Sequence, residues 1–266
     1  MATRILMCPP DHFRVGYAIN PWMEGNQSQV SPAEARAQWT ALHDAIAARA
    51  EVTLIEPAEA YPDMVFTADA GTVSNGVAAV CRFYHPERQG ERRLFRQWFN
   101  EQGLEVRELP EGASYEGGDA WLDPQEPWLW AGCGFRSSVE AHQLVGKFLD
   151  REVLSLKLVD PRFYHLDTCC SILTGGYVMY YPPAFSRDAL ALIESRVPAA
   201  KRIVVDDDDV LRFACNAVNI DDAVILNDAS DGLKAQLAAA GFEVIEVPLG
   251  EFLKAGGSAR CLTLKV

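Results

Sequence analysis

Hydrophobic and polar positions follow a unit that recurs about every 45 to 50 residues and predicts strand, turn, strand, helix and strand in that order. The clearest copy begins at residues 64–83, where two apolar stretches flank Asn75 and Gly76, a pair typical of a hairpin turn. The amphipathic stretch 86–103 then predicts a helix that stops at Gly103, and a further strand follows it.

Three more copies keep the same order of elements. The second occupies residues 114–159, the third residues 165–206 and the fourth residues 213–247. Their helices are predicted from amphipathic stretches that lie between apolar segments of strand length. The hairpin turns of the third and fourth copies are marked by Gly175 with Gly176 and by Asp221 with Asp222.

The fifth copy has to be completed by both ends of the chain. Residues 4–10 and 260–266 are short and strand-like, and residues 51–57 predict the outer strand. The helix between them starts with Ser31 as N-cap and Pro32 at its first position. Five units closed in this way make a ring of α/β units, with the first strands along the axis and the helices outside. We therefore expect one domain over residues 1–266.

Composition and charge exclude some classes of function. At 266 residues and 49% hydrophobic content the chain is long enough for a full core. No apolar stretch approaches the roughly 20 residues of a membrane span, and the N-terminus has no signal-peptide pattern, so we expect a cytoplasmic protein without a membrane partner. The net charge of −13, without a cluster of Lys and Arg, argues against nucleic acid and suits a cationic substrate.

The cysteines and acidic runs predict neither disulfides nor a metal. Seven cysteines without a C-x-x-C pair indicate no disulfide framework and no structural zinc site, so most should be small buried hydrophobes. The acidic run 206–209 lacks the spacing of a calcium loop, which predicts a solvated loop. We expect no metal and no cofactor.

In four of the five units, polar groups open the first strand beside apolar neighbours. Because a buried polar group costs a few kcal/mol unless it is paired, such groups converging on one axis indicate a mutually satisfied network or a ligand site. A structural network explains any single member, but the whole set favours a site. The set comprises Asp69, Glu116, Asp119, His165, Asp167, Asn216 and Asn219, and the segment GGSARC at 256–261 precedes the closing strand.

A cysteine, a histidine and a carboxylate that converge favour nucleophilic catalysis, in which a thiolate attacks and the imidazole moves protons. Nearby carboxylates oppose a thiolate unless the substrate itself is cationic, and a planar guanidinium offers paired N–H donors to carboxylates. Cys261 follows two glycines that free the backbone to present a side chain, whereas Cys215, the rival nucleophile, has apolar neighbours typical of a core residue.

Four segments carry a resemblance to a known family: PDMVFTADAG at 62–71, EGGD at 116–119, HLDT at 165–168 and GGSARCLTL at 256–264. With these four segments in this order, the chain resembles the guanidino-group-modifying enzymes, and the resemblance covers essentially its whole length. That superfamily contains arginine deiminases, dimethylarginine dimethylaminohydrolases, arginine dihydrolases and amidinotransferases. The resemblance implies a five-bladed α/β propeller (pentein), with ββαβ units around a central active-site channel.

The resemblance also implies a catalytic set. Cys261 would be the nucleophile that forms a covalent thiouronium (amidino) intermediate. His165 would be the general acid and base, and Glu116 would bind the guanidinium and assist proton transfer.

Further residues match substrate-binding positions of the family. Asp69 and Asp167 resemble the carboxylates that hold the guanidinium nitrogens, and Asp63 and Phe66 match pocket positions, with Phe66 packing on the guanidinium plane. The remaining matches are Arg88 and Arg136, which would hold the substrate carboxylate, and Asn20 near the pocket. For Arg88, a solvated helix start is the alternative.

The expected substrate is arginine, because Asp69 and Asp167 together favour an unmethylated guanidinium, and the expected products are citrulline and ammonia. The dihydrolases, which go on to ornithine, ammonia and carbon dioxide, typically have asparagine where this chain has Asp69. Dihydrolysis and dimethylarginine hydrolysis are the enzymatic alternatives, and an arginine-binding or catalytically silent propeller is the non-enzymatic one. The sequence does not determine the oligomeric state, and a homodimer is left open.

Overall fold

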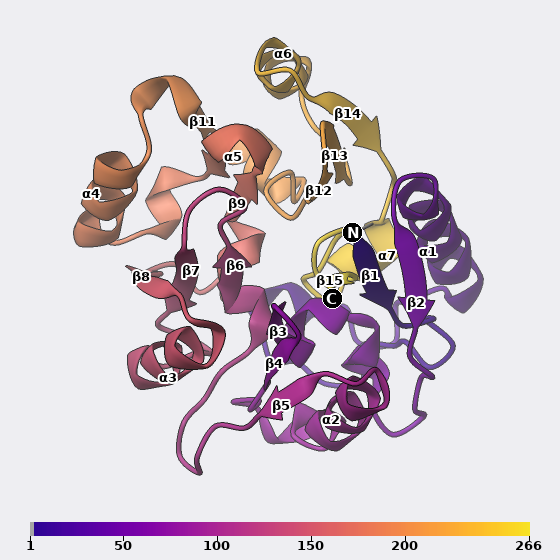
Figure 1. Cartoon of the computed structure of the whole chain (residues 1–266). Coiled ribbons are helices and arrows are strands. Elements are labelled where there is room, and N and C mark those ends of the chain that lie inside the picture. Colours follow the sequence, from indigo (N-terminus) through magenta and orange to yellow (C-terminus); the bar gives the residue numbers. More distant parts are fainter. Residues whose placement is uncertain (1–2) are drawn as a thin grey trace.

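The strands form five sheets of three strands each in the computed structural model, which describes residues 3–266. Figure 1 shows these sheets around a common centre, with the longer helices toward the outside. In every sheet the middle strand pairs antiparallel with the inner strand and parallel with the outer one. The helix of each unit joins the middle strand to the outer strand, so the predicted order of elements is confirmed.

The first sheet shows how the sequence produces a unit. Strands β3 (Gly71–Ser74) and β4 (Val77–Val80) form a hairpin, and helix α2 (Glu91–Glu101) leads to β5 (Glu105–Arg107). The turn residues Asn75 and Gly76 both have positive φ, at 51° and 79°, as this tight turn requires.

The helix of this unit is shorter than its amphipathic pattern predicts. Residues 86–103 form a 3-10 turn at Pro86–Arg88 and then α2, which begins after Gly90. A Cβ at Gly90 would lie 2.0 Å from the hydroxyl of Tyr61, so only glycine fits at this close approach.

The next three units repeat the pattern. The second contains β6 (Ala120–Leu122), β7 (Trp128–Cys133), α3 (Val139–Leu149) and β8 (Glu152–Lys157). The third contains β9 (Cys170–Leu173), β10 (Tyr177–Tyr180), α4 (Arg187–Arg196) and β11 (Arg202–Val204). The fourth contains β12 (Val218–Ile220), β13 (Ala223–Leu226), α6 (Asp231–Ala239) and β14 (Glu243–Glu246).

The fifth sheet joins the two ends of the chain, as predicted. Strand β15 (Leu264–Lys265) pairs with β1 (Arg4–Met7), and β1 pairs with β2 (Glu51–Leu54). Figure 1 shows the N- and C-terminal labels close together on this sheet. Helix α1 (Pro32–Ala47) has Ser31 as its N-cap, whose side chain accepts a hydrogen bond from the backbone N–H of Glu34.

The acidic run 206–209 matches its predicted solvated loop only in part: residues 206–208 are exposed, but the run starts a helix. Asp206 caps the short helix α5 (Asp207–Leu211), and Asp209 is buried. Its carboxylate accepts hydrogen bonds from the backbone N–H and the hydroxyl of Ser230, at 2.6 and 2.7 Å. Asp209 therefore fixes the N-terminus of α6 through Ser230. This contact joins segments that are distant in the sequence, so the local charge pattern does not reveal it.

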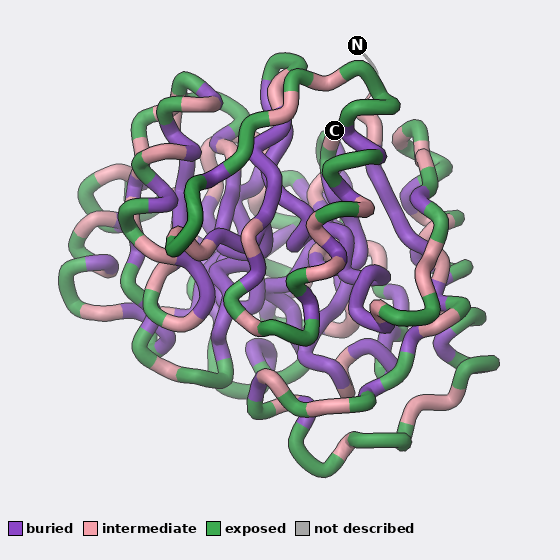
Figure 2. Tube along the Cα trace, turned by 90° about the horizontal axis from the view of Figure 1, so that it is seen from below, coloured by how far each residue is buried: buried purple, intermediate pink, exposed green. Residues whose placement is uncertain are grey.

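The short inner strands place a set of polar turns at the centre of the molecule. Three 3-10 turns immediately precede inner strands: η3 (Thr67–Ala70), η5 (Gly117–Asp119) and η6 (Leu166–Thr168). Figure 2 shows buried segments gathered in the interior and exposed ones around them. Among residues 3–266, no helix has the length and apolar character needed to cross a membrane.

The pairing of β15 with β1 should stabilise the whole fold. Leu264 is 2% exposed and packs in a buried cluster with Leu6 and Phe95, so replacing it with alanine leaves a cavity. We predict that Leu264→Ala lowers the free energy of unfolding by about 2–4 kcal/mol in urea denaturation. The exposed neighbour Lys265 is the matched control, and Lys265→Ala should change the free energy of unfolding by less than about 0.5 kcal/mol. Equal effects of the two substitutions would contradict this account.

Candidate active site

The side chains of Asp69, Glu116 and His165 meet because glycines remove the bulk between them. Asp69 lies in η3, Glu116 directly precedes η5 and His165 directly precedes η6. A Cβ at Gly118 would lie 2.6 Å from Asp69 Oδ1 and 2.7 Å from His165 Nδ1. A Cβ at Gly117 would lie 2.2 Å from the carbonyl oxygen of Ala68. The two glycines of EGGD thus let three strand starts approach each other.

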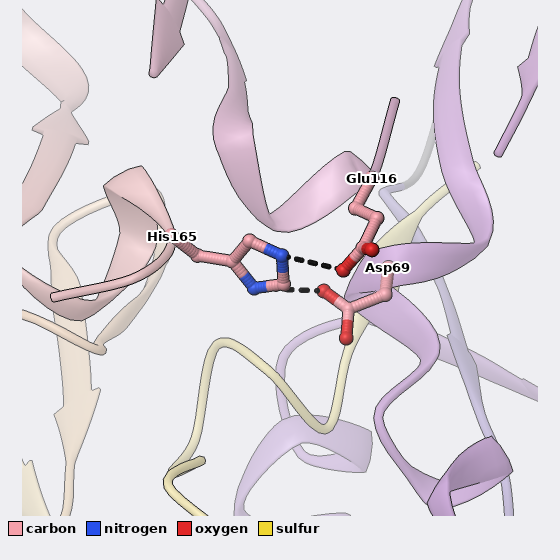
Figure 3. Close-up of side chains that lie close together, drawn as sticks. All are labelled: Asp69, Glu116 and His165. Carbon is pink, nitrogen blue, oxygen red and sulfur yellow. Dashed lines mark hydrogen bonds and ion pairs between the residues drawn. The ribbon is translucent and has the colours of Figure 1, made fainter. Parts of the chain in front are cut away.

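His165 lies between two carboxylates (Figure 3). Its Nε2 is 2.8 Å from Glu116 Oε2, and its Nδ1 is 3.4 Å from Asp69 Oδ1. Burial alone would lower the pKa of His165, but Asp69, the hydrogen bond to Glu116 and the charge of Asp119 together raise it to about 9. The imidazole is therefore protonated at neutral pH, with Nε2 donating to Glu116, and can deliver a proton.

Two buried arginines flank this group. Arg136 donates to Glu116 Oε2 at 3.0 Å and to the carbonyl of Ile19 at 2.8 Å. Burial would raise the pKa of Glu116, but Arg136 and His165 hold it well below its usual value, so Glu116 stays ionised.

Arg88 donates to Asp69 and to both carboxylate oxygens of Glu91. Since Arg88 is only 3% exposed, the alternative of a solvated helix start is wrong. Glu91, which is fully buried, was not predicted from the sequence, although its position three residues after Arg88 allows such a pair.

Cys261 lies next to Asp167 and Asn216. Its Sγ is 3.5 and 3.7 Å from the two carboxylate oxygens of Asp167, and Asn216 Nδ2 donates to Sγ at 3.1 Å. Burial and the charges of Asp167 and Asp69 raise the pKa of the Cys261 thiol well above its ordinary value. Burial also raises the pKa of Asp167 to about 6. Without a cation beside it, the thiol therefore keeps its proton.

A small cavity opens beside Cys261. Its volume of about 10 Å³ is room for about one water molecule. Seven of the predicted site residues line it, namely Asn20, Asp63, Phe66, Asp69, Arg88, Arg136 and Cys261. The other three, Glu116, His165 and Asp167, lie behind this lining, each within reach of a lining residue through the contacts given above. The structure thus brings all ten together.

Several buried polar atoms around the cavity have no hydrogen-bond partner among the described residues. They are Asp63 Oδ1, Asp69 Oδ1 and His165 Nδ1. Asp69 Oδ1 and His165 Nδ1 nevertheless face each other as an ion pair at 3.4 Å, so Asp63 Oδ1 is the acceptor of this group that lacks any partner. Because buried polar atoms are nearly always satisfied in folded proteins, an unpaired acceptor beside a cavity indicates a place for a ligand with N–H donors.

The segment between β1 and α1 covers the cavity. Tyr17 donates to Asp63 at 2.9 Å, and Asn20 Nδ2 donates to the carbonyl of Ala255 at 3.0 Å. Trp22 Nε1 donates to the carbonyl of Arg162 at 2.7 Å. Because the cavity has room for about one water molecule, a larger ligand can bind only if part of the lining moves.

Within residues 3–266, Asp69, Glu116 and His165 also form a group whose ligand atoms could surround a metal ion. Both carboxylates already pair with buried arginines, which supply positive charge where an ion would.

Cys215, the rival nucleophile, is fully buried in the hydrophobic core, as its apolar neighbours predict.

Comparison with known proteins identifies the family. The family model described as "N,N dimethylarginine dimethylhydrolase, eukaryotic" matches residues 17–266. The N(G),N(G)-dimethylarginine dimethylaminohydrolase of Mycobacterium tuberculosis is 42% identical over 99% of this chain and 85% of its own. The chain belongs to the dimethylarginine dimethylaminohydrolase family. This confirms the predicted resemblance to guanidino-group-modifying enzymes, and the named relatives support the prediction of a hydrolase that acts on C–N bonds of linear amidines.

Within this family, arginine dihydrolases are among the similar proteins. The bifunctional arginine dihydrolase/ornithine cyclodeaminase ArgZ of Synechocystis sp. is 55% identical over 99% of this chain. The chain spans only 37% of that relative's length. A solved structure of the N-terminal domain of ArgZ, a cysteine-to-serine variant bound to substrate, is 54% identical with a TM-score of 0.98, covering 99% of this chain and 98% of that one.

Proposed function

We propose that this protein is an arginine hydrolase that uses Cys261 as its nucleophile and carries arginine through to ornithine. The observation that carries the proposal is the thiol of Cys261 beside a cavity lined by the buried acids Asp63 and Asp69, of which Asp63 Oδ1 has no hydrogen-bond partner. A guanidinium supplies both the N–H donors and the positive charge that these groups lack. The similarity to arginine dihydrolases supports the choice of substrate.

In the proposed complex the guanidinium changes the electrostatics of the thiol. Its charge offsets Asp69 and Asp167, whose carboxylates oppose the thiolate in the free enzyme. Phe66, at the cavity wall, would pack on the planar group. Substrate binding would therefore itself promote ionisation of Cys261, so that a reactive thiolate forms only when a guanidinium is present.

In the proposed first hydrolysis, Cys261 acts as the nucleophile and His165 moves the protons. Sγ bonds to the guanidinium carbon, the bond from that carbon to a terminal nitrogen breaks, and ammonia leaves with a proton from His165. This gives the thiouronium intermediate. A water deprotonated by His165 then attacks the same carbon and displaces Sγ, which yields citrulline. Glu116 would hold the imidazole in place for both proton transfers.

Arg88 and Arg136 are proposed to hold the substrate carboxylate. In the closed structure their guanidinium groups instead pair with Asp69 and Glu116. A substrate guanidinium at Asp69 would compete directly with Arg88 for that carboxylate. Binding would therefore require Arg88 to exchange at least one partner as the segment containing Asn20 moves.

Ornithine replaces citrulline as the proposed final product because of the dihydrolase relatives. In the second round Sγ attacks the ureido carbon of citrulline, ornithine leaves, and water releases carbamate, which decomposes to carbon dioxide and ammonia. Asp69 is the observation that favours a deiminase ending at citrulline, because a carboxylate suits a cation better than a neutral ureido group. Its ion pair with Arg88 offsets that charge, so Asp69 is compatible with a neutral substrate.

Three wider features belong to the same proposal. The five sheets would form a closed propeller with its channel leading to Cys261, and residues 1–266 would make one domain. The partner would be a small guanidino compound, with no cofactor.

Product analysis by mass spectrometry tests the proposal. The protein is incubated with arginine, citrulline or asymmetric dimethylarginine, with Cys261→Ser as the inactive control. We predict ornithine from both arginine and citrulline, and a higher ratio of ornithine to citrulline for Asp69→Asn, which removes the negative charge. Citrulline alone from arginine would support the deiminase, dimethylamine from the methylated substrate would overturn the substrate choice, and no product at all would overturn the enzyme proposal.

The pH dependence of kcat/KM for arginine reports the free enzyme's acid and base. We predict that kcat/KM rises through pH about 6, because Asp167 loses its proton there and can hold the guanidinium. It should fall through pH about 9, because His165 then loses the proton that it donates. Asp119→Asn should move the descending limb to lower pH, because the charge of Asp119 helps to raise the pKa of His165. A descending limb near 6.5, the ordinary value for histidine, would contradict the assignment.

A further inference from the structure

Asn216 lies against Cys261 with its whole amide group engaged. The side chain is fully buried. Its Oδ1 accepts hydrogen bonds from the backbone N–H groups of Ser258 and Cys261, at 3.0 and 3.1 Å. Its Nδ2 donates to the carbonyl oxygen of Asp167 at 3.0 Å and to Cys261 Sγ at 3.1 Å. One side chain therefore joins the loop of the nucleophile to the turn that carries Asp167.

The surroundings determine which way this amide points. Two backbone N–H groups, which can only donate, face one end of it, and a carbonyl oxygen, which can only accept, faces the other. The oxygen must therefore lie toward Ser258, and the NH₂ group toward Cys261 Sγ. The sulfur is thus the acceptor of this hydrogen bond, a role that favours the thiolate over the neutral thiol.

The backbone of Asn216 holds the same loop. Its carbonyl oxygen accepts from the N–H of Arg260 at 3.1 Å, so residues 258–261 bond to Asn216 through three backbone N–H groups. The loop needs such support because Gly256 has a φ of 85°, a conformation that is rare for other residues, and Gly257 leaves no side chain to anchor it.

The acidic groups around the sulfur oppose its ionisation. They are Asp167 of η6, Asp69 of η3 and the phenol of Tyr164 before His165. The basic groups Arg88 and Arg136 line the same cavity, but they pair with Asp69 and Glu116. Hydrogen bonds from Asn216 and from the backbone N–H of Ser258 favour the anionic sulfur, so the bond from Asn216 counters the nearby acids.

We propose that Asn216 is a positioning residue that holds the Cys261 sulfur for attack and stabilises its anionic form. It acts through the nucleophile and does not touch the substrate. The inference rests on the proposed function for its role in turnover. The effect of Asn216 on the reactivity of the thiol can be measured without any turnover. This proposal and the proposed function can therefore fail separately.

The test compares Asn216→Asp with the parent protein and with Asn219→Asp. Aspartate has the same shape as asparagine but loses the donor to Sγ. Asn219 lies in β12 and bonds only to backbone groups of Thr174, Asp221 and Ala223, which makes it a matched control outside the site. The rate of Cys261 alkylation by iodoacetamide, a neutral probe, is followed between pH 6 and 10 by peptide mass spectrometry, together with kcat and KM for arginine.

We expect Asn216→Asp to slow alkylation of Cys261 about tenfold or more and to move its pH curve upward by about one unit or more. The kcat should fall about tenfold while KM changes less than about threefold, because the substrate contacts remain. Asn219→Asp should leave the alkylation curve unchanged.

Circular dichroism and a thermal melt verify that the variants are folded. Asn216→Ser, which is uncharged and too short to reach Sγ, is measured in parallel with the same expectation, because aspartate adds a negative charge as well as removing the donor. An alkylation curve identical to that of the parent in a folded variant would overturn the proposal. The variant could also show a shifted alkylation curve although the parent protein turns over no guanidino compound. That result would uphold the effect of Asn216 on the thiol and overturn the proposed function.

Discussion

A buried chain of alternating charges is the constraint on which the centre of this protein depends. It runs from Glu91 through Arg88, Asp69, His165 and Glu116 to Arg136, and every consecutive pair lies within ion-pair distance. Each of these groups alone would cost several kcal/mol to bury, so removal of Arg88 would leave Glu91, and removal of Glu116 would leave Arg136, buried without an ion-pair partner. Beside this chain, Asp63 Oδ1 has no hydrogen-bond partner and faces the cavity next to Cys261 together with Asp69. The same network that keeps the interior folded therefore prepares a place for a cation.

Much of this arrangement follows from local sequence. The turn pair Asn75 and Gly76 requires positive φ and forms the expected hairpin, and Ser31 with Pro32 starts α1 as predicted. Because every unit puts its first strand at the centre, the polar residues that open those strands had to converge. That reasoning, together with the family resemblance, found Cys261, His165 and Glu116 and the residues around them.

Other features depend on contacts between distant segments, which no local pattern encodes. Arg88 has the sequence context of an exposed helix start but is buried because Asp69 and Glu91 surround it. Asp209 belongs to an acidic run and is nevertheless buried against Ser230. The role of Asn216 depends on the closing loop of the chain, and the product depends on how far Arg88 offsets the charge of Asp69. These are properties of pairs of residues rather than of positions in one strand or helix.

The central claim is that Cys261 bonds covalently to the substrate carbon. Acid quenching during turnover of arginine, followed by peptide mass spectrometry, tests it most directly. The account predicts a peptide in which Cys261 carries arginine less one ammonia, a thiouronium carbon still bonded to the ornithine skeleton, and which is absent from the Cys261→Ser variant. A steady-state adduct on another residue such as Cys215, or undiminished turnover by Cys261→Ser, would contradict it.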